Sequence, residues 1–217
     1  MSKRVAIILS GCGVYDGAEI HESVITMLHL DRANAHVTCF APNVPQMHVI
    51  NHLNGEESPE TRNVLVEAAR IARGDVADLA SANVEDFDAV IVPGGFGAAK
   101  NLSDFAVSGA EMTINPAVKS FIQGMHAEGK PVGLVCIAPA MSGLLFGKGV
   151  ECTIGSDAET ASAIEQTGAV HVDCTVQGIH VDQQNKLVTT PAYMLAGRIS
   201  EADEGIGKLV AAVLELA

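Results

Sequence analysis

Residues 89–101 read AVIVPGGFGAAKN, and this stretch decides the class of fold. It opens with an apolar run that is too short for a helix, and a glycine-rich turn separates that run from a segment of helical composition. A short, continuously apolar strand followed by a turn and a helix is typical of a parallel sheet buried on both faces. The stretch therefore predicts one strand-turn-helix unit.

The same pattern recurs along the chain. Further short apolar runs cover residues 5–10, 37–41 and 131–136, and helical periodicity occurs within 61–73 and 115–129. Repeated units of this kind predict a mostly parallel sheet with right-handed crossovers and helices on both faces.

The pattern changes towards the C-terminal end. Residues 178–191 alternate between apolar and polar side chains around a turn at Gln184 and Asn185, which predicts a hairpin before a last helix over 193–216. We find no internal repeat and no linker. The sequence thus predicts a flavodoxin-like, doubly wound α/β fold, formed as a single domain by residues 1–217.

Composition limits the possible partners. Of the 217 residues, 48% are hydrophobic and 18% are charged, as expected of a globular protein with a large core. A formal net charge of -13 would repel nucleic acid and anionic membrane surfaces. The apolar run near the N-terminus stops at Ser10, too short for a signal peptide or a membrane span. We therefore expect a cytoplasmic protein with neither nucleic acid nor membrane as a partner.

The glycine-rich turn at residues 9–20, LSGCGVYDGAEI, raises the possibility of a nucleotide site. Its GxGxxxG pattern is weak evidence, because the second strand ends in VTCFAPN without an acidic residue for a ribose hydroxyl. The chain also lacks a P-loop, and this turn offers only Ser10 to a flavin phosphate. We therefore expect no nucleotide cofactor.

Cys136 is the strongest candidate for chemistry. It ends the apolar strand PVGLVC and directly precedes the helical pattern IAPAMSGLLF, so its sulfur would lie on a strand-to-helix turn, as in a nucleophile elbow. The positive end of the following helix would favour the thiolate, which is the nucleophilic form. From the pattern alone, a buried cysteine that only packs is an equally good interpretation.

The turn within residues 93–101 complements this cysteine. Consecutive glycines, Gly94 and Gly95, allow backbone N–H groups to face a crevice where an oxyanion could develop. We expect the amides of Gly95 and Ile137 to be the donors. Without a cysteine nearby, a plain turn that opens a helix is the better interpretation.

Three stretches carry a resemblance to a known family: ILSGCGVYDGAEIHE (8–22), VPGGFGAAKNLSDFA (92–106) and VCIAPAM (135–141). The chain resembles the PfpI-like superfamily of glyoxalases, deglycases and cysteine hydrolases, which is related to class I glutamine amidotransferases. It is most similar to a glyoxalase branch associated with isoprenoid biosynthesis. The resemblance runs nearly end to end and implies that Cys136 is the nucleophile, that Glu22 is its acidic partner and that the chain forms a homodimer.

Local pattern does not support Glu22 by itself. The apolar stripe of its helix consists of Ile20, Val24, Met27 and Leu28, so Glu22 falls on the opposite side, where a solvated residue is expected. Its competitor Glu19 lies three residues after Asp16 in an arrangement like a capping box, and its simplest role is to close the helix N-terminus. Glu22 is therefore assigned from the resemblance, with Glu19 in reserve.

One departure from the family bears on the reaction. The peptidase-like branch has a histidine directly after the cysteine, where this chain has Ile137, and the deglycase branch has one in a later loop, where this chain reads CTIGSDAE (152–159). Without an imidazole, amide hydrolysis lacks a general acid. Addition to an aldehyde expels no leaving group in its first step and suits the remaining residues better.

The resulting hypothesis is a glutathione-independent glyoxalase. The Cys136 thiolate would attack a small 2-oxoaldehyde, glyoxal or methylglyoxal, and Glu22 would shuttle protons from the hemithioacetal to a thioester that water hydrolyses to glycolate or lactate. Neither a metal nor an organic cofactor is implied. A redox-sensing or binding protein with a reactive cysteine is the alternative, followed by a cysteine hydrolase or amidase. The natural substrate and any link to isoprenoid synthesis stay open.

Other polar residues have simpler interpretations. His48 and His52 have a spacing that could bind a metal on one helix face, but a third ligand is missing and structural roles are favoured. His21 could line the pocket, although a solvated histidine is the simpler reading. Cys12 could place a second thiol in the crevice, while Cys39 is expected to pack in the core.

Overall fold

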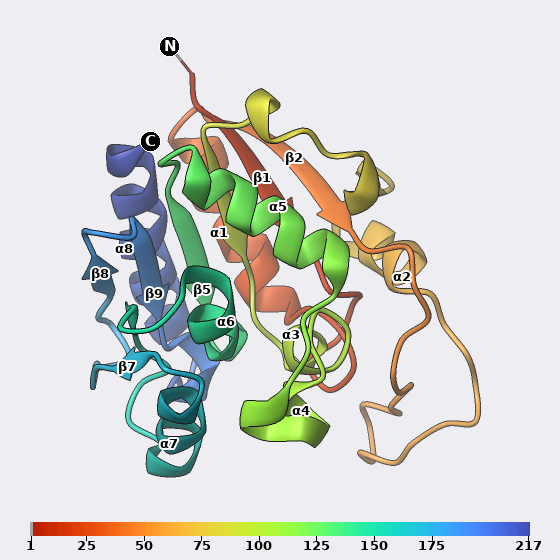
Figure 1. Cartoon of the computed structure of the whole chain (residues 1–217). Coiled ribbons are helices and arrows are strands. Elements are labelled where there is room, and N and C mark those ends of the chain that lie inside the picture. Colours follow the sequence, from red (N-terminus) through yellow and green to blue (C-terminus); the bar gives the residue numbers. More distant parts are fainter. Residues whose placement is uncertain (1) are drawn as a thin grey trace.

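The computed structural model describes residues 2–217. Within this range, seven strands form one sheet in the order β3-β2-β1-β4-β5-β9-β8 (Figure 1). Its pairs are parallel except for β8 and β9, which form an antiparallel hairpin. The strands of this sheet are β1 (Arg4–Ile8), β2 (His36–Ala41), β3 (Val76–Asp78), β4 (Ala89–Val92), β5 (Val132–Val135), β8 (His180–Asp182) and β9 (Leu187–Thr190). The predicted flavodoxin-like α/β fold is confirmed.

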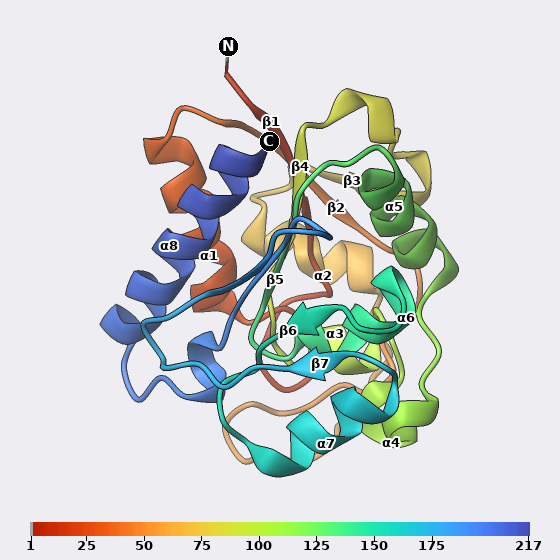
Figure 2. The ribbon, with the colours of Figure 1, turned by 60° about the vertical axis from the view of Figure 1, so that its left-hand side comes forward.

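Helices cover both faces of this sheet. In Figure 2, α1 and α8 lie on one side of the strands and α5 lies on the other. The helices are α1 (Ile20–Arg32), α2 (Val64–Ile71), α3 (Phe96–Lys100), α4 (Phe105–Ser108), α5 (Pro116–Ala127), α6 (Ser142–Phe146), α7 (Ala158–Gln166) and α8 (Ile199–Leu216). The central strands are therefore buried on both sides, which explains their uninterrupted apolar runs.

The two faces of β1 show how the core divides. Val5 and Ile7 pack in a cluster with side chains of α1, α2 and α8, whereas Ala6 and Ile8 pack in a cluster with side chains of α5, α6 and α7. All four side chains are fully buried. Because side chains alternate along a strand, both sets of β1 side chains face the core, which explains why these four residues are all apolar.

The structure of the C-terminal region agrees in part with the elements predicted from the sequence. The turn that joins β8 to β9 covers residues 183–186, so the hairpin predicted around Gln184 and Asn185 is confirmed. The last helix begins at Ile199, not at residue 193, because residues 192–194 form a separate 3-10 turn. A small sheet of β6 (Glu151–Cys152) and β7 (Val170–His171) was not predicted, since two-residue strands leave too little periodicity to detect.

The burial of α1 corrects the sequence interpretation. Its buried positions are Glu22, Ser23, Ile25, Thr26 and Leu30, whereas Ile20, Val24 and Leu28 of the predicted apolar stripe are 40–47% exposed. The buried hydroxyls are satisfied within the helix, because those of Ser23 and Thr26 donate to backbone oxygens four residues earlier. The inward face of the helix is therefore partly polar, and part of its apolar surface faces outward.

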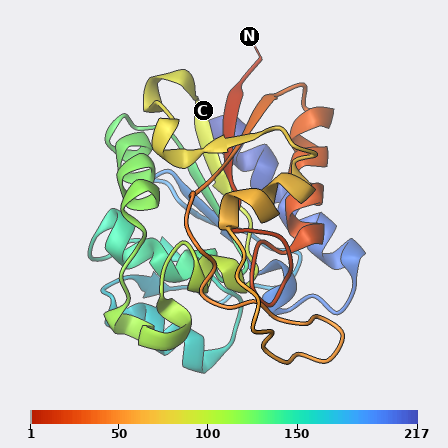
Figure 3. The ribbon, with the colours of Figure 1, turned by 90° about the vertical axis from the view of Figure 1, so that its right-hand side faces the viewer.

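The loops at the carboxyl ends of the strands are held together by Asn101, which follows α3. Its amide nitrogen donates to the backbone oxygens of Ser10 (2.9 Å) and Asp16 (2.8 Å), and its amide oxygen accepts from the N–H of Met47 (3.0 Å). Asn101 thus links the first glycine-rich loop to the long loop between β2 and α2, which projects from the sheet in Figure 3.

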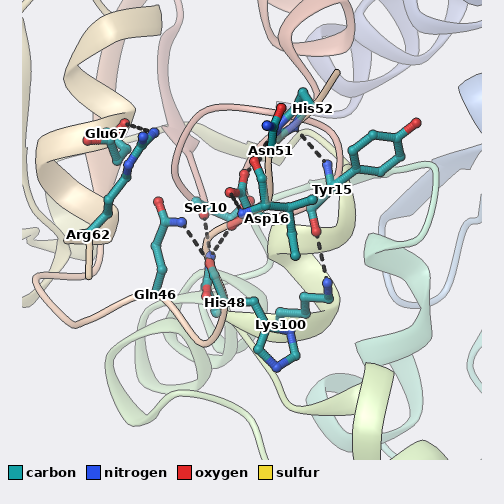
Figure 4. A network of polar contacts seen from close by, with 12 residues as sticks. Ser10, Tyr15, Asp16, Gln46, His48, Asn51, His52, Arg62, Glu67 and Lys100 are labelled. Atoms are coloured by element: carbon teal, nitrogen blue, oxygen red, sulfur yellow. Dashed lines mark hydrogen bonds and ion pairs between the residues drawn. The ribbon is translucent and has the colours of Figure 1, made fainter. Parts of the chain in front are cut away.

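Asp16 and His52 form further hydrogen bonds between the same two loops (Figure 4). The Asp16 carboxylate accepts from the N–H of Ile50 at 2.7 Å, and His52 Nε2 accepts from the N–H of Tyr15 at 3.2 Å. The other ring nitrogen of His52 lies 3.0 Å from the backbone oxygen of Ile50, so the histidine acts as a structural link. Among residues 2–217, no group of three or more histidine, cysteine, aspartate or glutamate side chains could hold a metal ion.

Replacing Asn101 should destabilise this region strongly. Asn101→Ala leaves two buried backbone oxygens and one N–H unpaired, and we expect the free energy of unfolding to fall by about 2–4 kcal/mol. Urea denaturation measures the change. Asn54→Ala, in the exposed part of the same long loop, should cost less than about 0.5 kcal/mol. Equal losses in the two variants would contradict the role given to Asn101.

Candidate active site

Cys136 follows directly after β5 in a strained backbone conformation. Its φ angle is +62°, in the left-handed region that residues other than glycine rarely adopt. Its N–H donates to the backbone oxygen of Thr190 at 2.9 Å, so the neighbouring strand β9 holds the turn in place. The side chain is 7% exposed and lines a cavity. A residue with a strained backbone, at the end of a strand and beside a cavity, resembles the nucleophile of a nucleophile elbow.

Glu22 lies in the first turn of α1 with a fully buried side chain. Its Oε2 accepts from the N–H of Gly94 at 2.9 Å, and its Oε1 accepts from the N–H of Tyr193 at 3.1 Å. The Cys136 thiol also donates a hydrogen bond to this carboxyl group. The sequence-predicted pair is thus brought together, although the two residues are far apart in the chain.

The start of α1 places Glu22. Glu19 is the N-cap residue, and its Oε2 accepts from the N–H of Glu22 at 2.7 Å. The expected role of Glu19 in closing the helix is confirmed, but Asp16 is not its capping partner, because the Asp16 carboxylate binds Ile50 instead. Because the Glu19 side chain caps the helix, the Glu22 side chain is free to accept from the N–H groups of Gly94 and Tyr193.

The pKa values of Glu22 and Cys136 are both raised. Burial raises the pKa of Glu22 to about 8, helped by the neighbouring Glu19, while the amides of Tyr193 and Gly94 act in the opposite direction. Burial also raises the pKa of the Cys136 thiol well above its usual range, and the Glu22 charge adds to the effect. Near neutral pH, the thiol therefore keeps its proton, whereas the Glu22 carboxyl group is present in both its protonated and its ionised form.

This result corrects the expectation that a helix N-terminus makes Cys136 a thiolate. The residues after the cysteine form a 3-10 turn over Ala138–Met141 before the short helix α6 begins. The amides of Gly95 and Ile137 do favour the anion, but burial and Glu22 outweigh them. Deprotonation of Cys136 therefore needs a group that takes up its proton, and Glu22 is in hydrogen-bond contact with the thiol.

The three residues predicted to form an oxyanion site, Gly94, Gly95 and Ile137, direct their N–H groups to two different partners. The N–H groups of Gly95 and Ile137 both point to the Cys136 sulfur. The N–H of Gly94 instead donates to Glu22, so it positions the carboxyl group. A Cβ atom on Gly94 would lie 2.4 Å from the Cys136 Cβ and 2.6 Å from Glu22 Oε2, so this close approach of three segments requires glycine.

The cavity above Cys136 has a volume of about 410 Å³. Its lining comes from loops and helices at the carboxyl ends of the strands, and consists of Val14, Glu19, Gly95, Phe96, Ala99, Phe105, Ala106, Cys136, Ile137, Thr160, Tyr193 and Met194. Within residues 2–217, neither Cys12 nor His21 is part of this lining. Cys12 is half-buried on the first loop, where burial and the neighbouring Glu67 raise its pKa.

Tyr193 is the residue that sequence reasoning missed. Its backbone N–H binds Glu22, its side chain lines the cavity, and its hydroxyl lies 2.8 Å from Nδ1 of the exposed His21. In the sequence, it appears only as part of the motif TTPAYML, which contains no feature that marks a functional tyrosine. Its place next to the end of β9, at the ligand-binding edge of the sheet, is the signal that could have found it.

Comparison with known proteins identifies the family. No protein-family model matches the chain. Over 98% of its length, the chain is 51% identical to human glutamine amidotransferase-like class 1 domain-containing protein 3, mitochondrial, of which the match covers 83%. The same share is 50% identical to the rat ES1 protein homolog, mitochondrial, of which it covers 84%. The chain belongs to this glutamine amidotransferase-like class 1 family.

Solved structures agree with this assignment. The chain is 39% identical to an isoprenoid biosynthesis protein with an amidotransferase-like domain from Ehrlichia chaffeensis, with a TM-score of 0.93 over 99% of both chains. Glyoxalase III from Candida albicans is 12% identical, with a TM-score of 0.61 over 97% of both chains. Drosophila melanogaster DJ-1beta is 20% identical, with a TM-score of 0.57. These last two similarities show that the chain shares its fold with both proteins.

The same comparison corrects the expected location. The human and rat relatives are both mitochondrial proteins, which contradicts the cytoplasmic localisation expected from the sequence. That expectation rested on a short apolar run, and such a run bears on secretion and membrane insertion but not on delivery to an organelle. Among residues 2–217, no helix has both the length and the apolar character to cross a membrane.

The pH dependence of Cys136 alkylation should reveal the charge of Glu22. Two neighbouring anions disfavour each other, so Glu22→Gln should lower the pKa of Cys136. We expect the alkylation rate profile to move to lower pH by about 1–2 units. Mass spectrometry of iodoacetamide-treated protein, followed at the Cys136 peptide, measures this rate. Glu204→Gln on the exposed face of α8 is the control, and an unmoved or upward-shifted profile in Glu22→Gln would contradict the coupling.

Proposed function

We propose that this chain is a glutathione-independent glyoxalase of the ElbB type, which converts glyoxal to glycolate and methylglyoxal to lactate. The observation that carries the proposal is the buried, hydrogen-bonded pair of Cys136 and Glu22, of which Cys136 lines the cavity. The similarity of the chain to an isoprenoid biosynthesis protein supports the choice of the glyoxalase branch associated with isoprenoid biosynthesis. In this proposal, residues 1–217 form a single domain that contains the whole site.

The first step would form a hemithioacetal. As the Cys136 sulfur bonds to the aldehyde carbon, Glu22 takes the thiol proton and the carbonyl oxygen gains the electron pair of the π bond. The N–H groups of Gly95 and Ile137, which point to the sulfur, would stabilise the developing oxyanion. Glu22 then returns its proton to that oxygen and becomes a carboxylate again.

The second step would move a hydrogen between neighbouring carbons. The Glu22 carboxylate removes the proton from the hemithioacetal carbon and leaves an enediolate. The hydroxyl proton moves to the neighbouring oxygen, and Glu22 delivers its proton to the adjacent carbon to give a thioester. Water then cleaves the thioester, which releases the hydroxy acid and restores the thiol. A carboxyl group with a pKa of about 8 suits this role, because it can both accept and donate a proton near neutral pH.

The alternatives receive less support. Peroxide reacts with thiolates, and the raised pKa of Cys136 disfavours a sensor that depends on a resting thiolate. A cysteine hydrolase of the peptidase-like branch has a histidine directly after its nucleophile, and this chain has the apolar Ile137 there. Aldehyde addition needs only the groups that this site offers.

Turnover of glyoxal and methylglyoxal by chelator-treated protein without glutathione tests the proposal. Wild-type protein should produce glycolate and lactate, Cys136→Ala should abolish turnover, and Glu22→Gln should lower kcat by about 10²–10⁴-fold. Cys174→Ser, which changes a partly exposed thiol on the loop between β7 and β8, should keep full activity. Unchanged turnover in Cys136→Ala would exclude the mechanism.

A homodimer is part of the same proposal. The apolar side chains of Ile20, Val24 and Leu28 on the exposed face of α1 are consistent with a second copy. Light scattering should give twice the chain mass of 22.5 kDa, and Val24→Glu should shift the protein towards the monomer. A monomeric wild-type protein at micromolar concentration would contradict this part.

A further inference from the structure

We propose that the preferred substrates of this site are 2-oxoaldehydes with an uncharged, apolar substituent larger than a methyl group. The inference rests on the glyoxalase function proposed above and concerns the part of the substrate that does not react. It is carried by the size of the cavity beside Cys136, by the side chains that line it and by the absence of cations from that lining.

The cavity is larger than the smallest oxoaldehydes require. Its volume of about 410 Å³ lies within the range of roughly 300–1,000 Å³ that is usual for sites of larger ligands. Glyoxal and methylglyoxal would occupy only the region next to the sulfur and leave most of this volume to water. A longer substituent would displace that water from apolar walls, which is favourable.

The lining is mainly apolar. It includes Val14, Phe96, Phe105, Ile137 and Met194, besides three small residues, Gly95, Ala99 and Ala106. Their elements converge from the first loop, α3, α4, the turn after Cys136 and the turn after β9. Figure 1 shows α3 and α4 below the carboxyl ends of the strands. The small residues of α3 and α4 leave the space that the larger apolar side chains surround.

Two aromatic rings give this wall its shape. Phe96 is 48% exposed, yet it is held in place, because Lys100 Nζ lies 5.4 Å from its ring centre and donates to the backbone oxygen of Tyr15 at 2.9 Å. Phe105, at the start of α4, is half-buried. An exposed aromatic ring next to an apolar cavity is expected where a ligand covers it.

Charge argues against an anionic substituent. Within residues 2–217, the cavity lining contains no lysine, arginine or histidine that could pair with a carboxylate or a phosphate. It does contain Glu19, whose carboxylate is 9% exposed and would repel a second anion. The polar groups that remain are Thr160 and Tyr193, which can bind uncharged oxygen atoms.

A homologous series of alkyl oxoaldehydes tests the inference, from methylglyoxal to 2-oxohexanal, together with an analogue of 2-oxohexanal that ends in a carboxylate. For wild-type protein, we expect kcat/KM to rise by about two- to fourfold with each methylene group. The terminal carboxylate should lower kcat/KM by at least about tenfold relative to 2-oxohexanal, because a buried charge would remain unpaired.

Two phenylalanine variants locate the effect. Phe105→Ala should flatten the rise, so that the ratio of kcat/KM for 2-oxohexanal to that for methylglyoxal falls by about tenfold. The matched control is Phe146→Ala, a half-buried phenylalanine on α6 that packs against His126 and should keep the wild-type ratio. Circular dichroism and the Tm of each variant show that the fold is retained.

The outcomes separate this inference from the proposed function. Turnover of methylglyoxal through Cys136 with a kcat/KM that stays level or falls along the series would overturn the substrate preference and leave the glyoxalase function intact. A similar or higher kcat/KM for the carboxylate analogue would do the same. Absence of turnover with every aldehyde would overturn the glyoxalase function, and this inference with it.

Discussion

The hydrogen-bonded contact between the Glu22 carboxyl group and the Cys136 thiol is the constraint on which the rest of the site depends. A carboxyl group without access to water is costly unless its oxygens are paired. Glu22 meets this requirement with the N–H groups of Gly94 and Tyr193 and with the thiol. Four segments, from α1 and from the ends of β4, β5 and β9, must therefore meet within hydrogen-bond distance, and that demand explains the glycine at 94.

The fold could be predicted from the sequence because buried parallel strands leave a direct signal. A strand such as β4, covered by helices on both faces, must be apolar at every position, and residues 89–92 meet this condition. The position of Cys136 at the edge of the sheet could be predicted for a related reason, since the end of such a strand is where ligands bind in an open sheet. Both inferences use only neighbouring residues. Local sequence was therefore sufficient for the strand and for the position of the cysteine.

Glu22 could not be predicted in this way, because helical periodicity assumes that apolar side chains face the core. In α1, this assumption fails: Val24 is 47% exposed, while Glu22 is fully buried. The polar side chains on the inward face are stabilised by partners from distant parts of the chain, such as Tyr193, and by hydrogen bonds of their hydroxyl groups within the helix. Only the family resemblance led to Glu22, since pairing across 171 positions leaves no local pattern.

The glycines of the first loop show how one pattern can serve two purposes. In nucleotide sites, such glycines bring backbone N–H groups close to a phosphate. Here, a Cβ atom on Gly17 would lie 2.3 Å from the backbone nitrogen of Cys12, and one on Gly97 would lie 2.5 Å from the backbone carbon of Gly17. The glycines therefore let one loop pack against another.

The N-terminus of α1 makes the distinction clear. In a phosphate site, the first N–H groups of the helix are free to bind the anion. In this chain, the Glu19 carboxylate caps the helix by binding the N–H of Glu22, and the Glu22 carboxyl group follows in the first turn. A phosphate brought to this position would meet acidic side chains, whereas a neutral aldehyde would meet a proton donor and acceptor. A loop followed by a helix can therefore serve two kinds of site. When acidic side chains cap the helix and occupy its first turn, the site favours acid-base chemistry on an uncharged substrate over phosphate binding.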